Sequence, residues 1–163
     1  MRKGFTMIEL IFVIVILGVL ASVAIPRLAA TRDDAEVAKA ATNLTTAISD
    51  LTAYYTAKGS FYSYTSSGNK GTKLTDFSKV TNALTKDGKL KVKSNIECVG
   101  VKLPDSTTAD TNVKITLAFT ENDAVCVQLK KLPGVRSMCG KSDQSKVDAT
   151  CEIQVGGSGG INF

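Results

Sequence analysis

The sequence predicts an α+β fold, with one long N-terminal helix packed on a small antiparallel β-sheet. Three observations support this prediction. Residues 5–25 form an apolar run with a single charge, residues 37–55 repeat apolar side chains with the period of a helix, and residues 90–155 alternate apolar and polar side chains. We therefore expect the helix over about residues 5–57 and the sheet after it.

The apolar run is long enough to cross a membrane. The 21 residues from Phe5 to Ile25 contain one charge, Glu9, and two hydroxyl side chains, Thr6 and Ser22. At about 1.5 Å per residue, a helix of this length spans about 31 Å, the thickness of the hydrocarbon core of a bilayer. A plain membrane anchor needs no carboxylate one turn from its start, whereas a helix that leaves the bilayer to pack against copies of itself has a use for one.

Three fates of this segment fit the sequence. A secretory signal would be cut after Ala24, where Ser22-Val23-Ala24 has the small-x-small pattern. An uncleaved anchor would keep its N-terminus inside. In the third case, cleavage after Gly4 removes a leader of residues 1–4 and leaves the apolar half-helix, residues 5–26, in the mature chain. The very short leader and the later cysteines place residues 27–163 outside as a globular head domain.

The helical pattern continues beyond Pro26, which is expected to kink the helix and not to end it. Apolar residues recur at alternating steps of three and four along the amphipathic half-helix 27–57, and Gly59 is the expected stop. The positions of this apolar stripe are Val37, Ala41, Leu44, Ile48, Leu51 and Tyr55.

The rest of the head domain is predicted to consist of a loop, a sheet region and a tail. Residues 58–89 are predicted to be a loop that contains a short helix over Thr75–Leu84 with Thr75 as its N-cap. Residues 90–155 form the β-sheet region, in which Val113–Leu129 is expected to be a hairpin, and residues 156–163 are a flexible tail. The predicted strands are Leu90–Lys93, Ile96–Leu103, Val113–Thr120, Ala124–Leu129 and Cys151–Val155.

Composition argues against an enzyme. The chain has 163 residues, no histidine and a formal charge of +5 from 20 basic and 15 acidic side chains. Without histidine, neither a Ser/His nor a Cys/His catalytic arrangement can form, and the commonest metal ligand is missing. The acidic residues Asp143, Asp148 and Glu152 are spaced too irregularly for an EF-hand loop. We therefore expect no catalytic residues, no cofactor and no metal.

The four cysteines Cys98, Cys126, Cys139 and Cys151 form no CxxC pair. An even number at wide spacing beyond an export-type segment indicates two disulfides in an oxidising compartment, and reduced core cysteines in a cytosolic protein are the alternative. Four cysteines allow three connectivities, so spacing alone leaves the pairing open.

Lysines gather in Lys86–Lys93, where four occur in eight residues, and Lys130-Lys131 adds a pair. Such a cluster allows DNA or a host polyanion as a partner. The segment has no arginine-rich or aromatic-interleaved surface, so an edge strand blunted by lysine is the favoured interpretation.

The N-terminal residues resemble those of type IV pilins and the related pseudopilins. Gly4-Phe5-Thr6-Met7-Ile8-Glu9-Leu10 follows basic residues and precedes a 16-residue apolar run, and Gly18 and Pro26 fall where many pilins carry a glycine and a kink-forming proline. Close similarity covers about the first 30 residues; the remainder agrees in layout and not by motif.

This resemblance implies that a prepilin peptidase cleaves between Gly4 and Phe5 and methylates the new amine of Phe5. Glu9 is then expected to meet the amine of a neighbouring subunit in the fibre, with snorkelling to lipid headgroups as the alternative. Gly18 and Pro26 bound a segment that either unwinds on leaving lipid or simply kinks. Cys98 and Cys126 lie in strand-like runs, which favours a pair Cys98–Cys126 across two strands. Cys139–Cys151 would then close a C-terminal loop, and many pilins have a disulfide-bounded loop of this kind.

The function implied is that of a structural subunit of a type IV pilus or pilus-like fibre. The expected partners are copies of itself, the prepilin peptidase, an inner-membrane assembly platform with its ATPase, and minor pilins. The chain would start in the bacterial inner membrane with a cytoplasmic N-terminus and end in a surface pilus or a periplasmic pseudopilus. The alternatives are a pseudopilin of a type II secretion or DNA-uptake machine, and a monomeric anchored or secreted binding domain.

Overall fold

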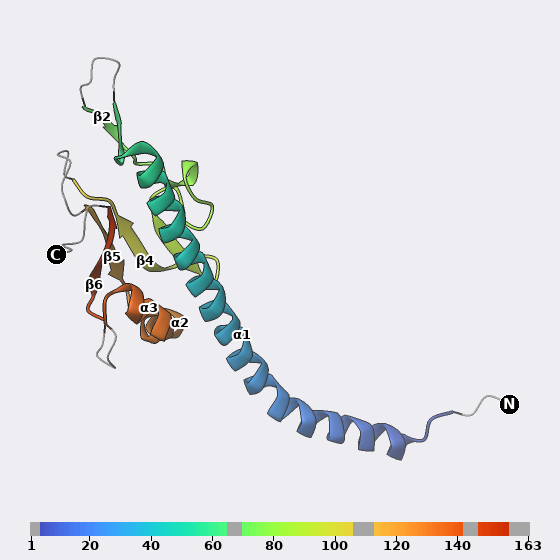
Figure 1. Ribbon diagram of the computed structural model, residues 1–163. Helices are drawn as coiled ribbons and strands as arrows, with labels where there is room; N and C mark the ends of the chain where they lie inside the picture. Colours follow the sequence, from blue (N-terminus) through green and yellow to red (C-terminus); the bar gives the residue numbers. More distant parts are fainter. Residues whose placement is uncertain (1–3, 65–69, 106–112, 142–146, 157–163) are drawn as a thin grey trace. The chain divides into compact units, whose positions relative to one another are not determined.

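The computed structural model describes residues 4–64, 70–105, 113–141 and 147–156, so the predicted tail from residue 157 and the first three leader residues lie outside the described residues (Figure 1). The chain divides into two compact units, an N-terminal unit Met1–Ala35 and a head unit Glu36–Phe163. The elements in chain order are α1 (Met7–Lys58), β1 (Tyr62–Tyr64), β2 (Lys70–Lys73), the 3₁₀ helix η1 (Phe77–Lys79), β3 (Lys89–Val92), β4 (Ile96–Lys102), β5 (Val113–Phe119), α2 (Ala124–Lys131), α3 (Pro133–Met138) and β6 (Thr150–Gly156).

Helix α1 is continuous over 52 residues, which confirms the long helix that the sequence predicted. It runs through Gly18 and Pro26 without a break. Gly59 follows its last residue with a φ of 71° and donates its N–H to the Tyr55 carbonyl at 2.7 Å. A residue with a Cβ is strained at this φ, so glycine is suited to end the helix here.

In the N-terminal unit, Met7–Ile25 is the stretch of α1 that is long and apolar enough to cross a membrane. Its mean hydropathy is 2.9, and none of it is buried inside the protein. A signal sequence near an N-terminus has a similar length and hydropathy. These two properties therefore do not distinguish a cleaved signal from a retained membrane helix.

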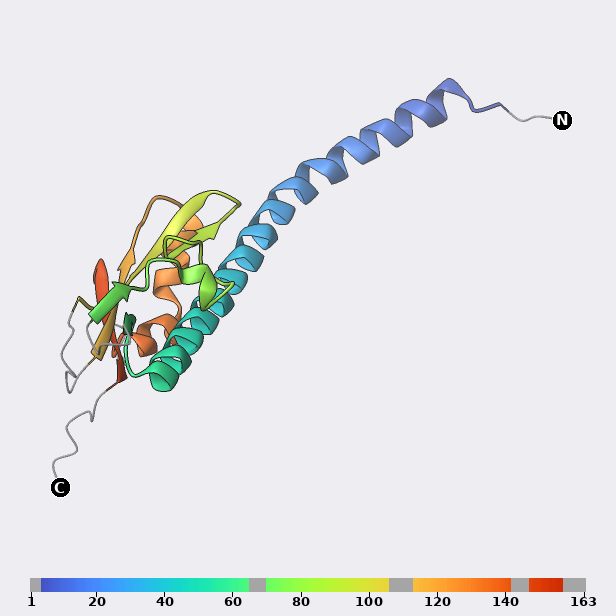
Figure 2. The ribbon, with the colours of Figure 1, turned by 90° about the horizontal axis from the view of Figure 1, so that it is seen from above.

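The head unit is built on a four-stranded antiparallel sheet in the order β3-β4-β5-β6. In its register Val99 pairs with Phe119, and Val101 pairs with Leu117. These apolar residues share one face of the sheet because side chains alternate along a strand. Figures 1 and 2 both show the second half of α1 lying along the sheet, so helix and sheet form two layers.

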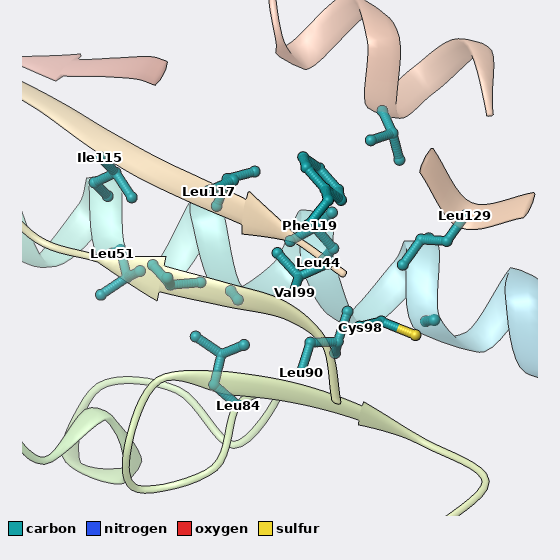
Figure 3. Packing of buried hydrophobic residues seen from close by; sticks show 14 of the residues in the cluster. Leu44, Leu51, Leu84, Leu90, Cys98, Val99, Ile115, Leu117, Phe119 and Leu129 are labelled. Atoms are coloured by element: carbon teal, nitrogen blue, oxygen red, sulfur yellow. The ribbon is translucent and has the colours of Figure 1, made fainter. Parts of the chain in front are cut away.

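The core of the head unit fills the space between these layers. The line of α1 that is buried consists of Val37, Ala40, Leu44, Ala47 and Leu51, at steps of three and four. The predicted stripe was nearly correct, since its other members are partly buried beside this line. Figure 3 shows Leu44 and Leu51 of α1 in one cluster with side chains of the sheet: Leu90, Val99, Ile115, Leu117 and Phe119.

The predicted hairpin over Val113–Leu129 is wrong in its second half. Ala124–Lys131 is helix α2, and Asp123 is its N-cap, because the Asp123 carboxylate accepts a hydrogen bond from the Val125 N–H at 2.8 Å. The alternation of apolar residues suggested a strand, but the buried residues Val125, Cys126 and Leu129 follow a helical spacing. Aspartate favours turns, which is why Glu121-Asn122-Asp123 predicts one, but it is equally favoured at a helix N-cap.

The predicted loop 58–89 contains more structure than expected. β1 and β2 form a two-stranded sheet in which Tyr62 pairs with Lys73. Contacts distant in sequence hold this sheet: the Lys73 ammonium donates to the Leu103 carbonyl at 2.9 Å and to the Asp105 carboxylate, and the Tyr62 hydroxyl donates to the Asp105 carbonyl at 3.2 Å. A local reading of the sequence gives no signal for such contacts.

The helix predicted over Thr75–Leu84 is also wrong. Only Phe77–Lys79 is helical, as a 3₁₀ turn, and its N-cap is Asp76 in place of Thr75. The Asp76 carboxylate accepts from the Ser78 N–H at 3.2 Å. Phe77 is the buried residue of this turn. Leu84 is also buried in the core, but it reaches the core from outside any helix.

Candidate processing and assembly site

The start of α1 is fixed by reciprocal hydrogen bonds between Thr6 and Glu9. The Glu9 carboxylate accepts from the Thr6 backbone N–H at 2.9 Å and from the Thr6 hydroxyl at 2.7 Å. The Glu9 N–H in turn donates to the Thr6 hydroxyl oxygen at 3.4 Å. This is a capping box, which satisfies backbone donors that have no partner inside the helix. The spacing Thr6-x-x-Glu9 is the sequence signal of such a box.

Gly4 and Phe5, the predicted cleavage position, precede the helix. Neither residue is helical, both are exposed, and the Phe5 side chain keeps 87% of its surface accessible. No atom lies within 4 Å of a Cβ built on Gly4. The Gly4–Phe5 peptide bond therefore lies on open, non-helical backbone, as a bond must if it is to enter a peptidase site.

The large apolar side chains described in the N-terminal unit are exposed. Among the described residues, every exposed large hydrophobic side chain lies between Phe5 and Leu28. The head unit, by contrast, buries its large apolar side chains in one core. A contiguous exposed apolar surface of this kind marks a lipid or protein contact.

The remaining predicted assembly residues lie on the same helix as Glu9 but on other turns. A Cβ on Gly18 would meet no atom within 4 Å, so Gly18 is a gap in the apolar surface. The Ser22 hydroxyl donates to the Val19 carbonyl at 2.7 Å, so its hydrogen-bonding capacity is used within its own helix. Proline at position 26 has no N–H to donate to the carbonyl one turn earlier.

Both pairs of cysteines are joined in the structure. Cys98 and Cys126, with Cα atoms 5.0 Å apart, are both 1% exposed. This disulfide joins β4 to α2, which corrects the expectation of a link between two strands. Cys139 and Cys151, with Cα atoms 5.5 Å apart, link the end of α3 to β6.

The lysine-rich segment Lys86–Lys93 contains β3, the edge strand of the sheet. Its lysines face carboxylates: the Lys89 ammonium lies 2.7 Å from Glu97, Lys91 lies 3.9 Å from the same carboxylate, and Lys93 lies 3.2 Å from Asp123. The hydrogen bond to Glu97 raises the pKa of Lys89. These partners favour the interpretation as a lysine-blunted edge over that of a free cationic surface for nucleic acid.

No group of three or more potential ligand side chains that could hold a metal occurs within residues 4–64, 70–105, 113–141 and 147–156. Asp143 lies outside the described residues.

Comparison with known proteins identifies the N-terminal segment. Residues 1–25 match the family model of the prokaryotic N-terminal methylation motif, which is the signature of type IV pilins and pseudopilins. No curated protein and no solved structure matches the chain. The motif spans Gly4, Phe5, Glu9 and Gly18.

The class of protein follows from this match and from the fold. A long N-terminal helix packed on an antiparallel sheet is consistent with the pilin-like fold, and the motif supports a type IV pilin-like or pseudopilin subunit. The motif points to a structural family that is generally not enzymatic.

Proposed function

We propose that this chain is the structural subunit of a type IV pilus or pilus-like fibre. A prepilin peptidase cleaves between Gly4 and Phe5 and methylates the Phe5 amine, and the mature subunits polymerise through α1. One observation carries the proposal: a row of exposed apolar side chains begins at the processing position and continues to Leu28 with Glu9 as its only charge before Arg27. A lipid anchor and a fibre core both need such a surface.

In this proposal the precursor waits in the inner membrane with its N-terminus in the cytoplasm. An assembly platform with its ATPase then extracts it, minor pilins take part in assembly, and the chain ends in a surface pilus or a periplasmic pseudopilus. The span Met7–Ile25 supports the membrane stage. The cystine-containing head supports an oxidising compartment for the rest of the chain.

Glu9 has a distinct role in assembly. A carboxylate inside an apolar helix is costly in lipid, and after cleavage the Phe5 amine supplies a cation one helical turn away. In the fibre the Glu9 carboxylate meets the amine of a neighbouring subunit. A buried ion pair sets the register between helices more readily than it adds net stability.

Mass spectrometry of the mature N-terminus tests the proposal. Methyl-phenylalanine at residue 5 is the expected result. A mature chain that starts at Ile25 indicates a secreted domain instead, and an intact Met1 indicates a plain anchor; either result contradicts the proposal.

The second candidate is a pseudopilin of a type II secretion or DNA-uptake machine, because pseudopilins share the motif at residues 1–25. Electron microscopy of cells with and without the gene separates the two. Gene-dependent surface filaments favour a pilus. Methylated subunits without surface filaments, together with loss of secretion or of DNA uptake in the deletion strain, favour a pseudopilus.

A further inference from the structure

An apolar groove lies within the head unit, between α1 and α3. Ala41 and Thr45 of α1 form one wall, and residues 132–135 with Met138 form the other. Its volume is about 350 Å³. Val135 is 1% exposed at this site, whereas Pro133 and Gly134 are exposed. The groove is therefore a surface depression with a buried apolar floor.

The lining has no polar side chain free to orient a small ligand. Thr45 is its only hydroxyl residue, and that hydroxyl already donates to the Ala41 carbonyl at 2.9 Å. Small-molecule pockets combine apolar walls with a few placed polar groups, which fix the orientation of the ligand. A groove that presents only apolar groups can bind the apolar side chains of another helix.

We propose that this groove receives apolar side chains from the N-terminal half of α1 of a second copy. This inference rests on the proposed function and deepens it by assigning an acceptor on the head. The chain itself presents the required occupant, since its exposed large hydrophobic side chains lie between Phe5 and Leu28 among the described residues. The groove is also continuous with α1, the helix through which the subunits are proposed to pack.

Gly134 provides a variant that adds bulk to the lining of the groove. A Cβ on Gly134 would meet no atom within 4 Å, so the isolated head accommodates Gly134→Leu, which places a large side chain on a residue that lines the groove. Gly100→Leu is the matched control, because a Cβ there meets only the Ala118 carbonyl oxygen at 4.0 Å. Gly100 lies on the other face of the sheet, since its neighbours Val99 and Val101 are buried in the core.

The experiment compares the amount of each full-length variant in sheared fibres. Gly134→Leu is expected to lower fibre yield about fivefold or more, because an overpacked contact costs at least about 1 kcal/mol. Gly100→Leu is expected to match wild type. A Gly134→Leu yield equal to wild type overturns the inference and leaves the proposed function standing, whereas a wild-type chain that never polymerises overturns both.

Cross-linking tests the occupant directly and does not depend on the folding of a leucine variant. A photo-reactive phenylalanine derivative replaces the exposed Thr45, and another replaces the exposed Lys102 as a control. In assembled fibres, position 45 is expected to cross-link to a peptide from residues 5–28 of another copy, and position 102 is not. Cross-links from position 45 only to head peptides, or none between copies, overturn the inference.

Discussion

The Thr6 hydroxyl donates to the Glu9 carboxylate at 2.7 Å, and the Glu9 N–H returns a hydrogen bond to that hydroxyl oxygen at 3.4 Å. Glu9 therefore has a role within its own subunit before it meets any other. Its carboxylate caps the helix, and a negative charge in the first turn is also favoured by the helix dipole. The capping role and the proposed role in assembly can be separated, because only the second requires the charge.

Glu9→Gln and Glu9→Ala are expected to leave processing and membrane insertion intact and to lower fibre incorporation by similar amounts. Glutamine keeps an oxygen that can accept from Thr6, so the helix cap survives while the charge is lost. Immunoblots of sheared fibres and of membranes measure incorporation and insertion, and mass spectrometry measures processing.

Thr6→Ala is the matched control for the cap. It removes the hydroxyl that bonds to Glu9 and leaves the carboxylate in place, so its fibre yield is expected to exceed that of Glu9→Gln. A Glu9→Gln variant that assembles like wild type, beside a defective Thr6→Ala, would assign Glu9 to capping alone.

The hydrogen bonds of Asp123 lead us to expect that the stability of the head unit falls in acid. The backbone N–H of Val125 and, secondly, the Lys93 ammonium lower the pKa of the Asp123 carboxyl. A carboxyl with a folded-state pKa below its unfolded value of about 3.9 stabilises the fold above that value. This contribution is lost as the pH falls through the lowered pKa.

Thermal unfolding of the full chain in detergent at pH 7 and pH 3 measures this effect by circular dichroism. Asp123→Asn keeps a capping oxygen for α2 but does not titrate, so its melting temperature is expected to fall less between the two pH values than that of wild type. An equal fall in both proteins would assign the acid sensitivity to other carboxylates.

At Gly88, replacement by alanine is expected to change the stability of the head strongly. Its φ is 73°, and a Cβ there would lie 2.7 Å from the ring of Phe77, a buried residue. Gly88→Ala is therefore expected to destabilise the head by about 1–3 kcal/mol. Gly134→Ala is the control and is expected to stabilise the head. Its site in α3 is open, and alanine has a higher helix propensity than glycine. Urea unfolding measures both changes.

Much of the fold could be predicted because its signals are local. Helix α1 and strands β3 to β6 have strong periodicities, and Gly59 marks the end of α1. Helix α2 was missed because eight residues are too few to distinguish the two periods around Cys126. The N-cap Asp123 and the basic residues of its last turn were the available signals.

The candidate sites also include residues that the sequence reveals and residues that it does not. The processing residues Gly4 and Phe5 and the acid Glu9 are contiguous in sequence, so a motif finds them. The groove brings Ala41 together with Gly134, and the β1–β2 sheet depends on contacts from Lys73 to Leu103 and Asp105. Such long-range contacts are set by packing of the whole head, and one sequence does not reveal them.

The two disulfides are expected to contribute unequally to stability. Peptide mapping without reduction should recover Cys98–Cys126 and Cys139–Cys151, and any other pair would contradict the proposed connectivity. With sequence separations of 28 and 12 residues, the loop-entropy relation gives about 3.6 and about 2.8 kcal/mol respectively. Replacing both cysteines of the buried Cys98–Cys126 pair by alanine should therefore lower the melting temperature more than replacing the other pair.

The segment between Gly18 and Pro26 is expected to be the least protected part of α1 in assembled fibres. Gly18 weakens the helix by about 1 kcal/mol relative to alanine, and Pro26 removes one backbone hydrogen bond. Residues 40–55 instead bury Leu44, Ala47 and Leu51 against the sheet. Hydrogen exchange followed by mass spectrometry should be about fivefold or more faster over residues 18–26 than over residues 40–55, since 1 kcal/mol changes an opening equilibrium by about that factor. The variant Gly18→Ala should slow exchange in the first range only. Equal protection of both ranges in the wild-type fibre would leave a simple kink at Pro26 as the explanation of these two residues.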